Sequence, residues 1–186
     1  MTTHQESTKK SLIFLTGFMG SGKSTIGPIL ANTLGIDFID VDKLIERKAD
    51  QRIVDIFEHA GEQTFRDVER QALQEVAGKE AAVVSLGGGT MSSEENFELV
   101  HRNGIIVYLQ LSPEEIFFRV RNRTDRPMLK DASGNLLKGP ELESKIRELL
   151  SAREQFYSRA DIIIPADKKK LGATVDEIVT KLRKLK

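Results

Sequence analysis

One short stretch limits what this chain can fold into more than any other, the glycine-rich sequence GFMGSGKST at residues 17–25. It follows an apolar run, Ser11–Thr16, and precedes an amphipathic stretch, Lys23–Leu34. A G-x-x-x-x-G-K-S sequence between a strand and a helix surrounds phosphate oxygens with backbone N–H groups and the positive end of the helix. A glycine-rich turn with a chance Lys-Ser pair is the alternative, but it would need neither flanking element. The sequence therefore predicts a P-loop.

The P-loop motif also predicts which residues bind ATP. Lys23 is expected to reach the β- and γ-phosphates, and the Ser24 hydroxyl to ligate Mg²⁺. The dinucleotide fingerprint G-x-G-x-x-G is not met in this stretch, so a nucleoside triphosphate is the predicted ligand. The predicted ATP-binding residues of the loop are Gly20, Ser21, Gly22, Lys23, Ser24 and Thr25.

The rest of the chain alternates short apolar runs with amphipathic stretches. Continuous apolar runs are typical of strands buried on both faces of a parallel sheet. The predicted strands include Ser11–Thr16 and residues 81–86, 105–111 and 161–164. The predicted helices include Lys23–Leu34 and residues 62–76, 142–157 and 174–185. This order predicts an α/β fold, a P-loop three-layer α/β/α architecture with a central five-stranded parallel sheet.

Length and composition narrow the class of protein. The 186 residues suit one domain, and we expect a disordered tail at residues 1–10 and a single domain at residues 11–186. Lys plus Arg and Asp plus Glu both number 28, which argues against a nucleic-acid partner. The absence of Cys excludes disulfides and thiolate metal sites. No apolar run approaches the roughly 20 residues that a membrane helix needs, so we expect no membrane partner. The expected location is cytoplasmic, with which the absence of Cys is compatible.

Two carboxylates follow a further apolar stretch. Residues 38–42 (FIDVD) are interpreted as the end of a second strand, in which side chains two apart point to the same face. Asp40 and Asp42 would then lie side by side where such sheets bind ligands, beyond the strand ends. Two close carboxylates need a cation or a donor between them, and Mg²⁺ with an acceptor hydroxyl would supply both. The alternative is a solvated turn with one Asp as a helix cap.

Two arginines occupy unusual positions in the helical pattern. Arg153 falls on the apolar stripe of its predicted helix, seven residues after Ile146 and four after Leu149. A guanidinium that faces inward must be paired, either with an internal carboxylate or with an anionic ligand. Arg66 stands at the rim of another buried face, where Glu69 can hold it in place. A surface ion pair is the alternative for Arg66.

Two further segments are candidate ligand contacts: a glycine triplet after a predicted strand and a group of arginines near a predicted helix end. Gly87, Gly88 and Gly89 follow a strand and would let a ligand approach the backbone, although a flexible turn is the alternative. Four arginines fall within residues 119–126, ahead of the polar stretch 130–140. A basic mobile loop opposite a P-loop predicts a lid that excludes water and brings an Arg to the transferring phosphoryl group. The alternative is a solvated basic helix end.

Taken together, these motifs closely resemble those of the shikimate kinase family, from about residue 11 to the end of the chain. The P-loop alone is unspecific, but the ordered set is highly specific. Besides the P-loop and the glycine triplet, the set comprises D-x-D at 40–42, F-R-x-x-E at 65–69, R-P-x-L at 126–129 and R-x-x-x-Y at 153–157. The resemblance implies a P-loop kinase domain with a substrate-binding region at about 43–77 and a lid at about 124–140. It also implies transfer of the γ-phosphoryl group of ATP to the 3-hydroxyl of shikimate, on the route to chorismate and the aromatic amino acids.

On the acceptor side, the resemblance implies that Asp42 binds the shikimate hydroxyl, either as a base or only to orient it. Asp40 would help to hold Mg²⁺ indirectly, through groups that bind the ion, and would not be a ligand itself. Arg66 and Arg153 would clamp the carboxylate. The glycine triplet completes the implied substrate site, with the N–H of Gly88 facing the ligand.

On the ATP side, the resemblance implies that Arg126 is the lid arginine at the phosphates. It joins Lys23 and Asp42 as the implied catalytic residues. An arginine of the preceding helix would pack on adenine, and Arg121 is favoured over Arg119. The implied partners are ATP or ADP and shikimate, with Mg²⁺ as cofactor and the chain as a monomer.

Two other functions are compatible with parts of this pattern. Another small-molecule kinase of the same fold, such as a gluconate-type kinase, would also need a carboxylate clamp. A non-catalytic nucleotide-binding regulator is the second, but degenerate members of such folds usually lose the Lys or the acids. Lys23, Ser24, Asp40 and Asp42 are all present in this chain.

Overall fold

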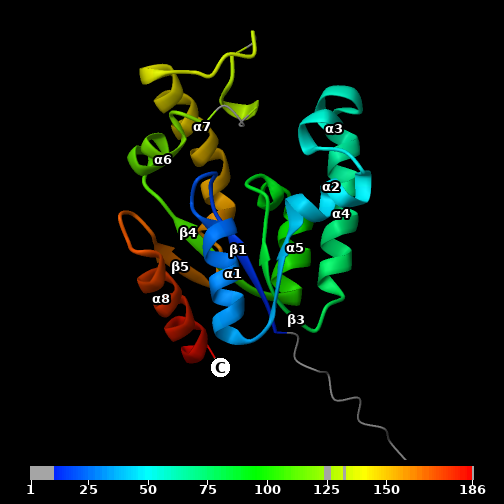
Figure 1. The fold of residues 1–186 in the computed structure, drawn as a ribbon, viewed down its shortest axis with the longest axis vertical. Helices are drawn as coiled ribbons and strands as arrows, with labels where there is room; N and C mark the ends of the chain where they lie inside the picture. Colours follow the sequence, from blue (N-terminus) through cyan, green and yellow to red (C-terminus); the bar gives the residue numbers. More distant parts are fainter. Residues whose placement is uncertain (1–10, 124–126, 132, 186) are drawn as a thin grey trace, which may run out of the picture.

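The structure is a computed structural model that describes residues 11–123, 127–131 and 133–185. The predicted tail, residues 1–10, and the predicted lid residue Arg126 lie outside the described residues. The described chain forms one sheet of five parallel strands in the order β2-β3-β1-β4-β5 (Figure 1). The strands are β1 (Ser11–Thr16), β2 (Asp37–Asp40), β3 (Ala81–Ser85), β4 (Gly104–Gln110) and β5 (Ile162–Pro165).

Helices cover both faces of this sheet. The helices are α1 (Lys23–Leu34), α2 (Val41–Ala49), α3 (Ile53–His59), α4 (Gly61–Ala77), α5 (Glu94–Asn103), α6 (Pro113–Val120), α7 (Gly139–Tyr157) and α8 (Leu171–Lys184). Side chains of α1 and α8 pack on one face, and side chains of α2, α4, α5 and the end of α7 pack on the other. The predicted three-layer α/β/α architecture with a five-stranded parallel sheet is therefore confirmed. None of the described helices is both long and apolar enough to span a membrane.

The central strand β1 explains why its sequence is apolar without alternation. Leu12 and Phe14 belong to the core on the side of α4 and α5, whereas Ile13 and Leu15 belong to the core beside α1 and α8. Neighbouring side chains of a strand point to opposite faces, so a strand covered on both faces needs apolar residues at every position. β1 lies between β3 and β4, and this position places the loop after it at the middle of the sheet edge.

The two sides of that edge are built from different helices. Figure 1 shows α6 and α7 on one side and α2 and α3 on the other, with the end of β1 between them. A separate apolar cluster joins α6 and α7 to the P-loop through Phe18, Val120, Ile146 and Leu149. The P-loop is thus packed directly against the side that carries α7.

The prediction that residues 38–42 form the end of a strand is confirmed for residues 38–40 and wrong for Val41 and Asp42. β2 ends at Asp40, and Asp42 lies in the first turn of α2. The physical reason is a helix cap: the Asp40 carboxylate accepts a hydrogen bond from the Lys43 amide at 3.3 Å and starts the helix at Val41. The two acids therefore do not share one face of a strand, and the helix-cap alternative holds for Asp40.

Part of the segment predicted as a lid has local structure of its own. Residues 130 and 136 form an antiparallel bridge, and the Asp131 carboxylate accepts hydrogen bonds from the Ser133 and Asn135 amides at 2.8 and 2.9 Å. Leu129 is fully buried in the cluster that contains Phe18. The burial of Leu129 ties this part of the segment to α6 and α7, whereas the other contacts lie within the segment itself. Its movement as a lid stays a prediction.

Gly104 lies where α5 passes into β4 without a connecting loop: α5 ends at Asn103, and β4 begins at Gly104. It pairs with Leu12 of β1, and a Cβ added at position 104 would collide with the Leu12 carbonyl oxygen and Cβ. Two of the three atoms nearest to it belong to the backbone of the central strand, which cannot move aside.

Gly104→Ala is expected to lower the free energy of unfolding by about 1–3 kcal/mol, because the added methyl group forces β1 and β4 apart. The measurement is urea unfolding followed by circular dichroism. Gly172→Ala in α8 is the matched control, since a Cβ there meets no atom within 4 Å. It should leave stability unchanged or raise it slightly through helix propensity. Equal stabilities of the two variants would contradict the proposed collision.

Candidate active site

The P-loop wraps around the N-terminus of α1. Gly17 and Gly20 have φ angles of 141° and 81°, in a region that glycine adopts without strain. The Gly22 carbonyl accepts hydrogen bonds from the Thr25 and Ile26 amides at 3.0 and 2.8 Å and so begins the helix. The helix dipole favours an anion at this end, as the motif predicts.

The Lys23 ammonium is held inside this loop. The residue is 9% exposed, and its Nζ donates to the carbonyl oxygens of Gly17 and Phe18 at 2.7 and 3.2 Å. Neutral carbonyls are weaker partners for an ammonium than charged phosphate oxygens are. A triphosphate in the loop would therefore meet a positive charge that is already in position.

Asp42 reaches the glycine triplet from α2. A Cβ added at Gly87 would lie 2.7 Å from the Asp42 Oδ1 atom, so only the lack of a side chain permits this approach. Asp42 is partly buried at the start of α2, where the helix dipole favours its negative charge. The structure thus brings Asp42 beside Gly87, although by a helix and not by the strand that the sequence predicted.

The same triplet brings the two predicted clamp arginines together. A Cβ added at Gly88 would lie 3.6 Å from Arg153 Nη1 and 3.8 Å from the Met19 amide nitrogen of the P-loop. A Cβ added at Gly89 would lie 3.7 Å from Arg66 Nη2. The triplet therefore forms a floor on which Asp42, Arg153, Arg66 and the P-loop meet.

The backbone of the triplet presents its amides and not its carbonyls. The carbonyl oxygens of Gly87 and Gly89 accept hydrogen bonds from the Thr90 and Ser92 amides at 3.2 and 3.0 Å. The carbonyl oxygen of Gly88 accepts a hydrogen bond from the Tyr157 hydroxyl at 2.8 Å. Within the described residues, no backbone carbonyl accepts a hydrogen bond from the three N–H groups of the triplet. Such N–H groups beside a guanidinium are suited to bind an anion.

Arg66 is anchored by carboxylates. Its Nη1 donates to Glu69 Oε2 at 2.8 Å and its Nη2 to Glu62 Oε1 at 3.0 Å. Burial would lower the pKa of Arg66, but the hydrogen bonds and charges of Glu69 and Glu62 outweigh it and raise the pKa above its usual value. The prediction that Glu69 holds Arg66 is confirmed.

Glu69 has two further partners that the sequence did not reveal. It is 1% exposed and accepts a hydrogen bond from Thr90 Oγ1 at 2.7 Å. Asn96 donates to the Thr90 carbonyl at 3.1 Å and lies 3.5 Å from Glu69 Oε2. The position of Thr90 directly after the triplet was a signal for its role, whereas nothing in the sequence indicated Asn96.

Arg153 is less neutralised than Arg66. Its Nη1 atom is buried and has no hydrogen-bond partner among the described residues. The described chain contains no carboxylate in an ion pair with it, so the internal salt bridge considered from the sequence is not found there. The guanidinium lies over the Phe18 ring, with 5.2 Å from Cζ to the ring centroid. A buried donor without a partner is costly, and an anionic ligand would supply one.

Of the arginines near the predicted adenine site, the structure places Arg119 against the P-loop. Its Nη1 donates to the Gly20 carbonyl at 3.0 Å, and its Nε donates to Glu115 at 2.7 Å. Arg121, the residue favoured from the sequence, is exposed and lies over the Phe118 ring at 4.6 Å. Sequence reasoning missed the contact of Arg119, because helical periodicity does not show which side of α6 faces the P-loop. The role of Arg121 at adenine stays a prediction.

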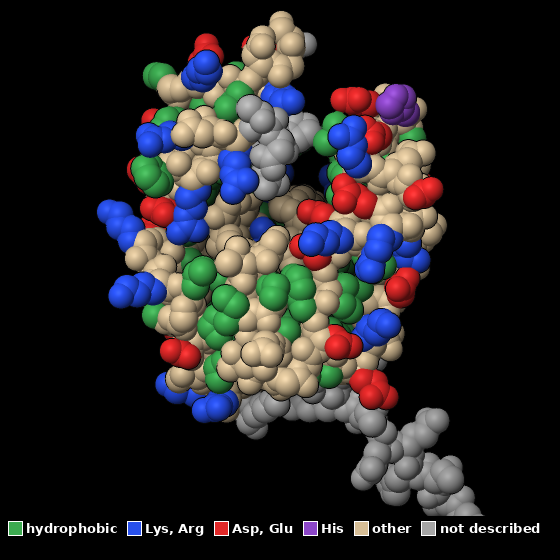
Figure 2. Space-filling model, in the orientation of Figure 1, with side chains coloured by type: hydrophobic (Ala, Val, Ile, Leu, Met, Phe, Trp, Pro, Cys, Tyr) green, Lys and Arg blue, Asp and Glu red, His purple; other side chains and the backbone are tan. Residues whose placement is uncertain are grey.

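The space above the triplet opens at the surface. Figure 2 shows the molecule hollowed between the side that carries α6 and α7 and the side that carries α2 and α3. Acidic and basic side chains border this hollow on the side of α2 and α3, and basic side chains lie near it on the side of α6 and α7 (Figure 2). The hollow lies between the two groups of helices that flank the end of β1.

The donor set is suited to Mg²⁺ held mainly by phosphates. Among the described residues, no group of three His, Cys, Asp or Glu side chains could hold a metal ion by itself. Mg²⁺ is usually bound by one or two protein oxygens together with substrate phosphates and water. Ser24 at the start of α1 offers such an oxygen, whereas one carboxylate oxygen of Asp40 already caps α2.

A phosphate loop at the middle of a parallel sheet, facing a second anion-binding region across the same edge, defines the class of P-loop kinases. One wall is suited to a nucleoside triphosphate. The other is suited to a small acid with a hydroxyl group near Asp42.

Comparison with known proteins narrows this class. The family model described as shikimate kinase matches residues 19–183. The shikimate kinase of Chlorobaculum parvum is 48% identical over 94% of this chain and 93% of its own length, and that of Chlorobium limicola is 50% identical over 90% and 84%. The chain belongs to the shikimate kinase family, and it is an ATP-using kinase of the shikimate pathway.

Solved structures agree with this assignment. Shikimate kinase from Acinetobacter baumannii, solved in complex with shikimate, has a TM-score of 0.85 at 33% identity and covers 95% of each chain. Shikimate kinase from Bacteroides thetaiotaomicron has a TM-score of 0.82 at 35% identity, over 93% of this chain and 98% of its own. A gluconokinase from Sinorhizobium meliloti, with a TM-score of 0.56 and 19% identity over 95% of this chain and 93% of its own, shares the fold alone.

Glu69→Gln is expected to lower the free energy of unfolding by about 3 kcal/mol, because it leaves the charge of Arg66 without its buried partner. The measurement is chemical denaturation. Glu62→Gln is the matched control: Glu62 contacts the same guanidinium, but its side chain is 68% exposed, and its loss should change stability by less than about 1 kcal/mol. Similar losses in both variants would contradict Glu69 as the main anchor.

Proposed function

We propose that this chain transfers the γ-phosphoryl group of ATP to the 3-hydroxyl of shikimate, giving shikimate 3-phosphate and ADP. The observation that carries the proposal is the floor of the site. An unpaired guanidinium nitrogen of Arg153 and the amides of the glycine triplet lie together, opposite the P-loop. These donors suit the single carboxylate of shikimate, and Asp42 beside them suits one of its hydroxyls.

The two arginines contribute differently to binding this carboxylate. Arg153 offers an unpaired donor, so the carboxylate would relieve an unsatisfied buried group. Arg66 already has Glu62 and Glu69 as partners, and its position is therefore set before the substrate arrives. In this proposal Arg153 supplies most of the electrostatic attraction for the carboxylate. Arg66 fixes the orientation of the carboxylate, because a donor that is already held in place loses little entropy on binding.

The chemistry follows from placement. Asp42 accepts a hydrogen bond from the attacking hydroxyl and directs it toward the loop that holds the triphosphate. The transition state of phosphoryl transfer is loose and needs little help from a base, so orientation carries most of the effect of Asp42. Lys23 holds the phosphates. The Ser24 hydroxyl would hold Mg²⁺ directly and Asp40 would do so indirectly, and the ion would supply positive charge to neutralise the phosphates.

Several finer assignments are part of the same proposal. Arg126 contacts the transferring phosphoryl group from a lid at about residues 124–140, and Arg121 packs on adenine. The substrate-binding region extends over about residues 43–77. The chain works as a monomer in the cytoplasm. The contact between Arg119 and the P-loop supports an arginine of α6 near the nucleotide.

The acceptor is tested by coupled ADP release with ATP and Mg²⁺, comparing shikimate, gluconate and no acceptor. Shikimate should give turnover at least about 100-fold above the other two, because its ring fixes the spacing between carboxylate and hydroxyl, whereas the open chain of gluconate must lose conformational freedom to match it. Removal of Mg²⁺ with a chelator should abolish turnover, and excess Mg²⁺ should restore it. Equal rates with gluconate, or ADP release that needs no acceptor, would contradict the proposal.

Asp42→Asn is expected to reduce kcat by about 10²-fold or more while ATP binding remains, because the hydroxyl loses its charged acceptor. The measurements are steady-state kinetics and calorimetric ATP binding. Asp50→Asn is the matched control, since Asp50 is exposed at the C-terminal end of the same helix in a left-handed conformation that Asn also adopts. Normal turnover of the Asp42 variant would remove its assigned role.

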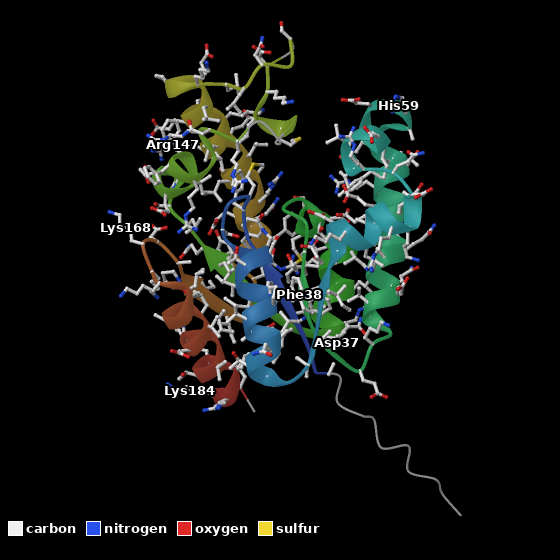
Figure 3. The ribbon with its side chains drawn as sticks, in the orientation of Figure 1. Asp37, Phe38, His59, Arg147, Lys168 and Lys184 are labelled. Carbon is white, nitrogen blue, oxygen red and sulfur yellow. The ribbon has the colours of Figure 1, made fainter. Side chains whose placement is uncertain are left out.

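Arg153→Lys is expected to raise the KM for shikimate by about 10- to 100-fold with little change in the KM for ATP, because Lys cannot form the paired hydrogen bonds of a guanidinium. Arg147→Lys is the matched control. Figure 3 shows Arg147 toward the outer side of α7, where it pairs with Glu114 and Glu143. A parallel rise in both KM values would assign Arg153 to the fold and not to the acceptor.

A further inference from the structure

We propose that Tyr157 is a positioning residue whose hydroxyl orients the backbone of the glycine triplet toward the carboxylate of the acceptor. The inference rests on the proposed function of this site and extends it to a residue that does not itself touch the substrate. It is carried by one partly buried contact, the hydrogen bond of 2.8 Å from the Tyr157 hydroxyl to the Gly88 carbonyl oxygen.

The triplet needs such a tether because glycine has the greatest backbone freedom of any residue. The carbonyls of Gly87 and Gly89 are held locally, by the short helical turn Thr90–Ser92 that follows. The carbonyl of Gly88 is held instead by a side chain 69 residues away in sequence. Without the Tyr157 hydroxyl, the middle peptide of the triplet loses the one hydrogen bond that the described residues give its carbonyl oxygen.

The direction of this bond sets the direction of an amide. In a trans peptide the C=O and the N–H of the next residue point in opposite directions. Because the Gly88 carbonyl points to Tyr157, the Gly89 N–H points away from it. Gly89 is the triplet residue closest to the Arg66 guanidinium, and Gly88 is the one closest to Arg153. The tether therefore acts on the part of the backbone that lies between the two arginines.

Tyr157 is also placed to couple this peptide to Arg153. The two residues are four apart on α7 and so share one face of the helix. Burial raises the pKa of Tyr157 to about 12, and both the charge of Arg153 and a side-chain hydrogen bond with Arg153 oppose that rise. Tyr157 is 1% exposed. Its hydroxyl stays protonated at neutral pH and therefore donates to the Gly88 carbonyl oxygen there. One helix face thus sets both a guanidinium and a peptide of the acceptor site.

Tyr108 of β4 provides a close internal comparison. Its ring stacks on that of Tyr157 with 4.7 Å between centroids, and it is equally buried. Its hydroxyl, however, donates to Glu154 at 3.3 Å, and both residues line a groove of about 590 Å³ between α7 and the ends of β4 and β5. Tyr108 therefore shares the packing of Tyr157 but not its contact with the triplet.

The experiment compares Tyr157→Phe with Tyr108→Phe, which each remove one buried hydroxyl from the same aromatic pair. Steady-state kinetics with shikimate and ATP are measured for both variants and for the wild-type chain, together with melting temperatures. Tyr157→Phe should raise the KM for shikimate about tenfold and leave the KM for ATP unchanged, the factor expected for loss of one hydrogen bond. Tyr108→Phe should leave both KM values unchanged, whatever its melting temperature.

Equal shikimate KM values in the two variants, or a matching rise in the KM for ATP, would overturn the inference. A wild-type chain that does not phosphorylate shikimate would instead overturn the proposed function, so the two failures are distinguishable. Should Tyr157→Phe not fold, the chain labelled with 3-fluorotyrosine offers a second measurement, because it contains two tyrosines. The ¹⁹F resonance of Tyr157 should shift on saturation with shikimate more than that of Tyr108. An equal or smaller shift would overturn the inference.

Discussion

The missing side chains of the glycine triplet are the constraint on which the acceptor site depends. A methyl group at Gly87 would press on the Asp42 carboxylate, and one at Gly88 or Gly89 would come into contact with Arg153 or Arg66. The strand β3 delivers this bare backbone to the same sheet edge as the P-loop, because the two strands are parallel neighbours. Any side chain on the triplet would occupy the space where the charged groups meet.

The two guanidinium groups on this floor differ in how far protein carboxylates neutralise them. Arg66 has two carboxylate partners, one of them buried. Arg153 has the face of Phe18 and a nearby Tyr157 hydroxyl, neither of which carries a full negative charge. A site that holds one neutralised and one unneutralised guanidinium favours a ligand with a single carboxylate. This is the property that separates an organic acid from a neutral sugar as acceptor.

Several features of the fold were predictable because local chemistry determines them. The P-loop, the continuous apolar strands and the α/β/α layers follow from glycine conformation and from burial on both faces of the sheet. The end of β2 was not predicted, because strand alternation and a helix cap compete over the same residues and the Asp40 cap prevails. The contact of Arg119 with the P-loop also escaped prediction, because helical periodicity does not reveal which side of α6 faces a loop 99 residues away.

The sequence by itself determined the phosphate site, since a contiguous loop and the helix after it supply most of its donors. It also determined the residue types of the acceptor site, because a glycine triplet and an inward-facing arginine stand out from any helical or strand pattern. Only the tertiary structure decided how these groups are paired: that Glu69 is shared by Arg66 and Thr90, and that Tyr157 reaches Gly88. Partners separated by 21 to 69 residues are chosen by packing in three dimensions, and no local preference of the chain encodes that choice.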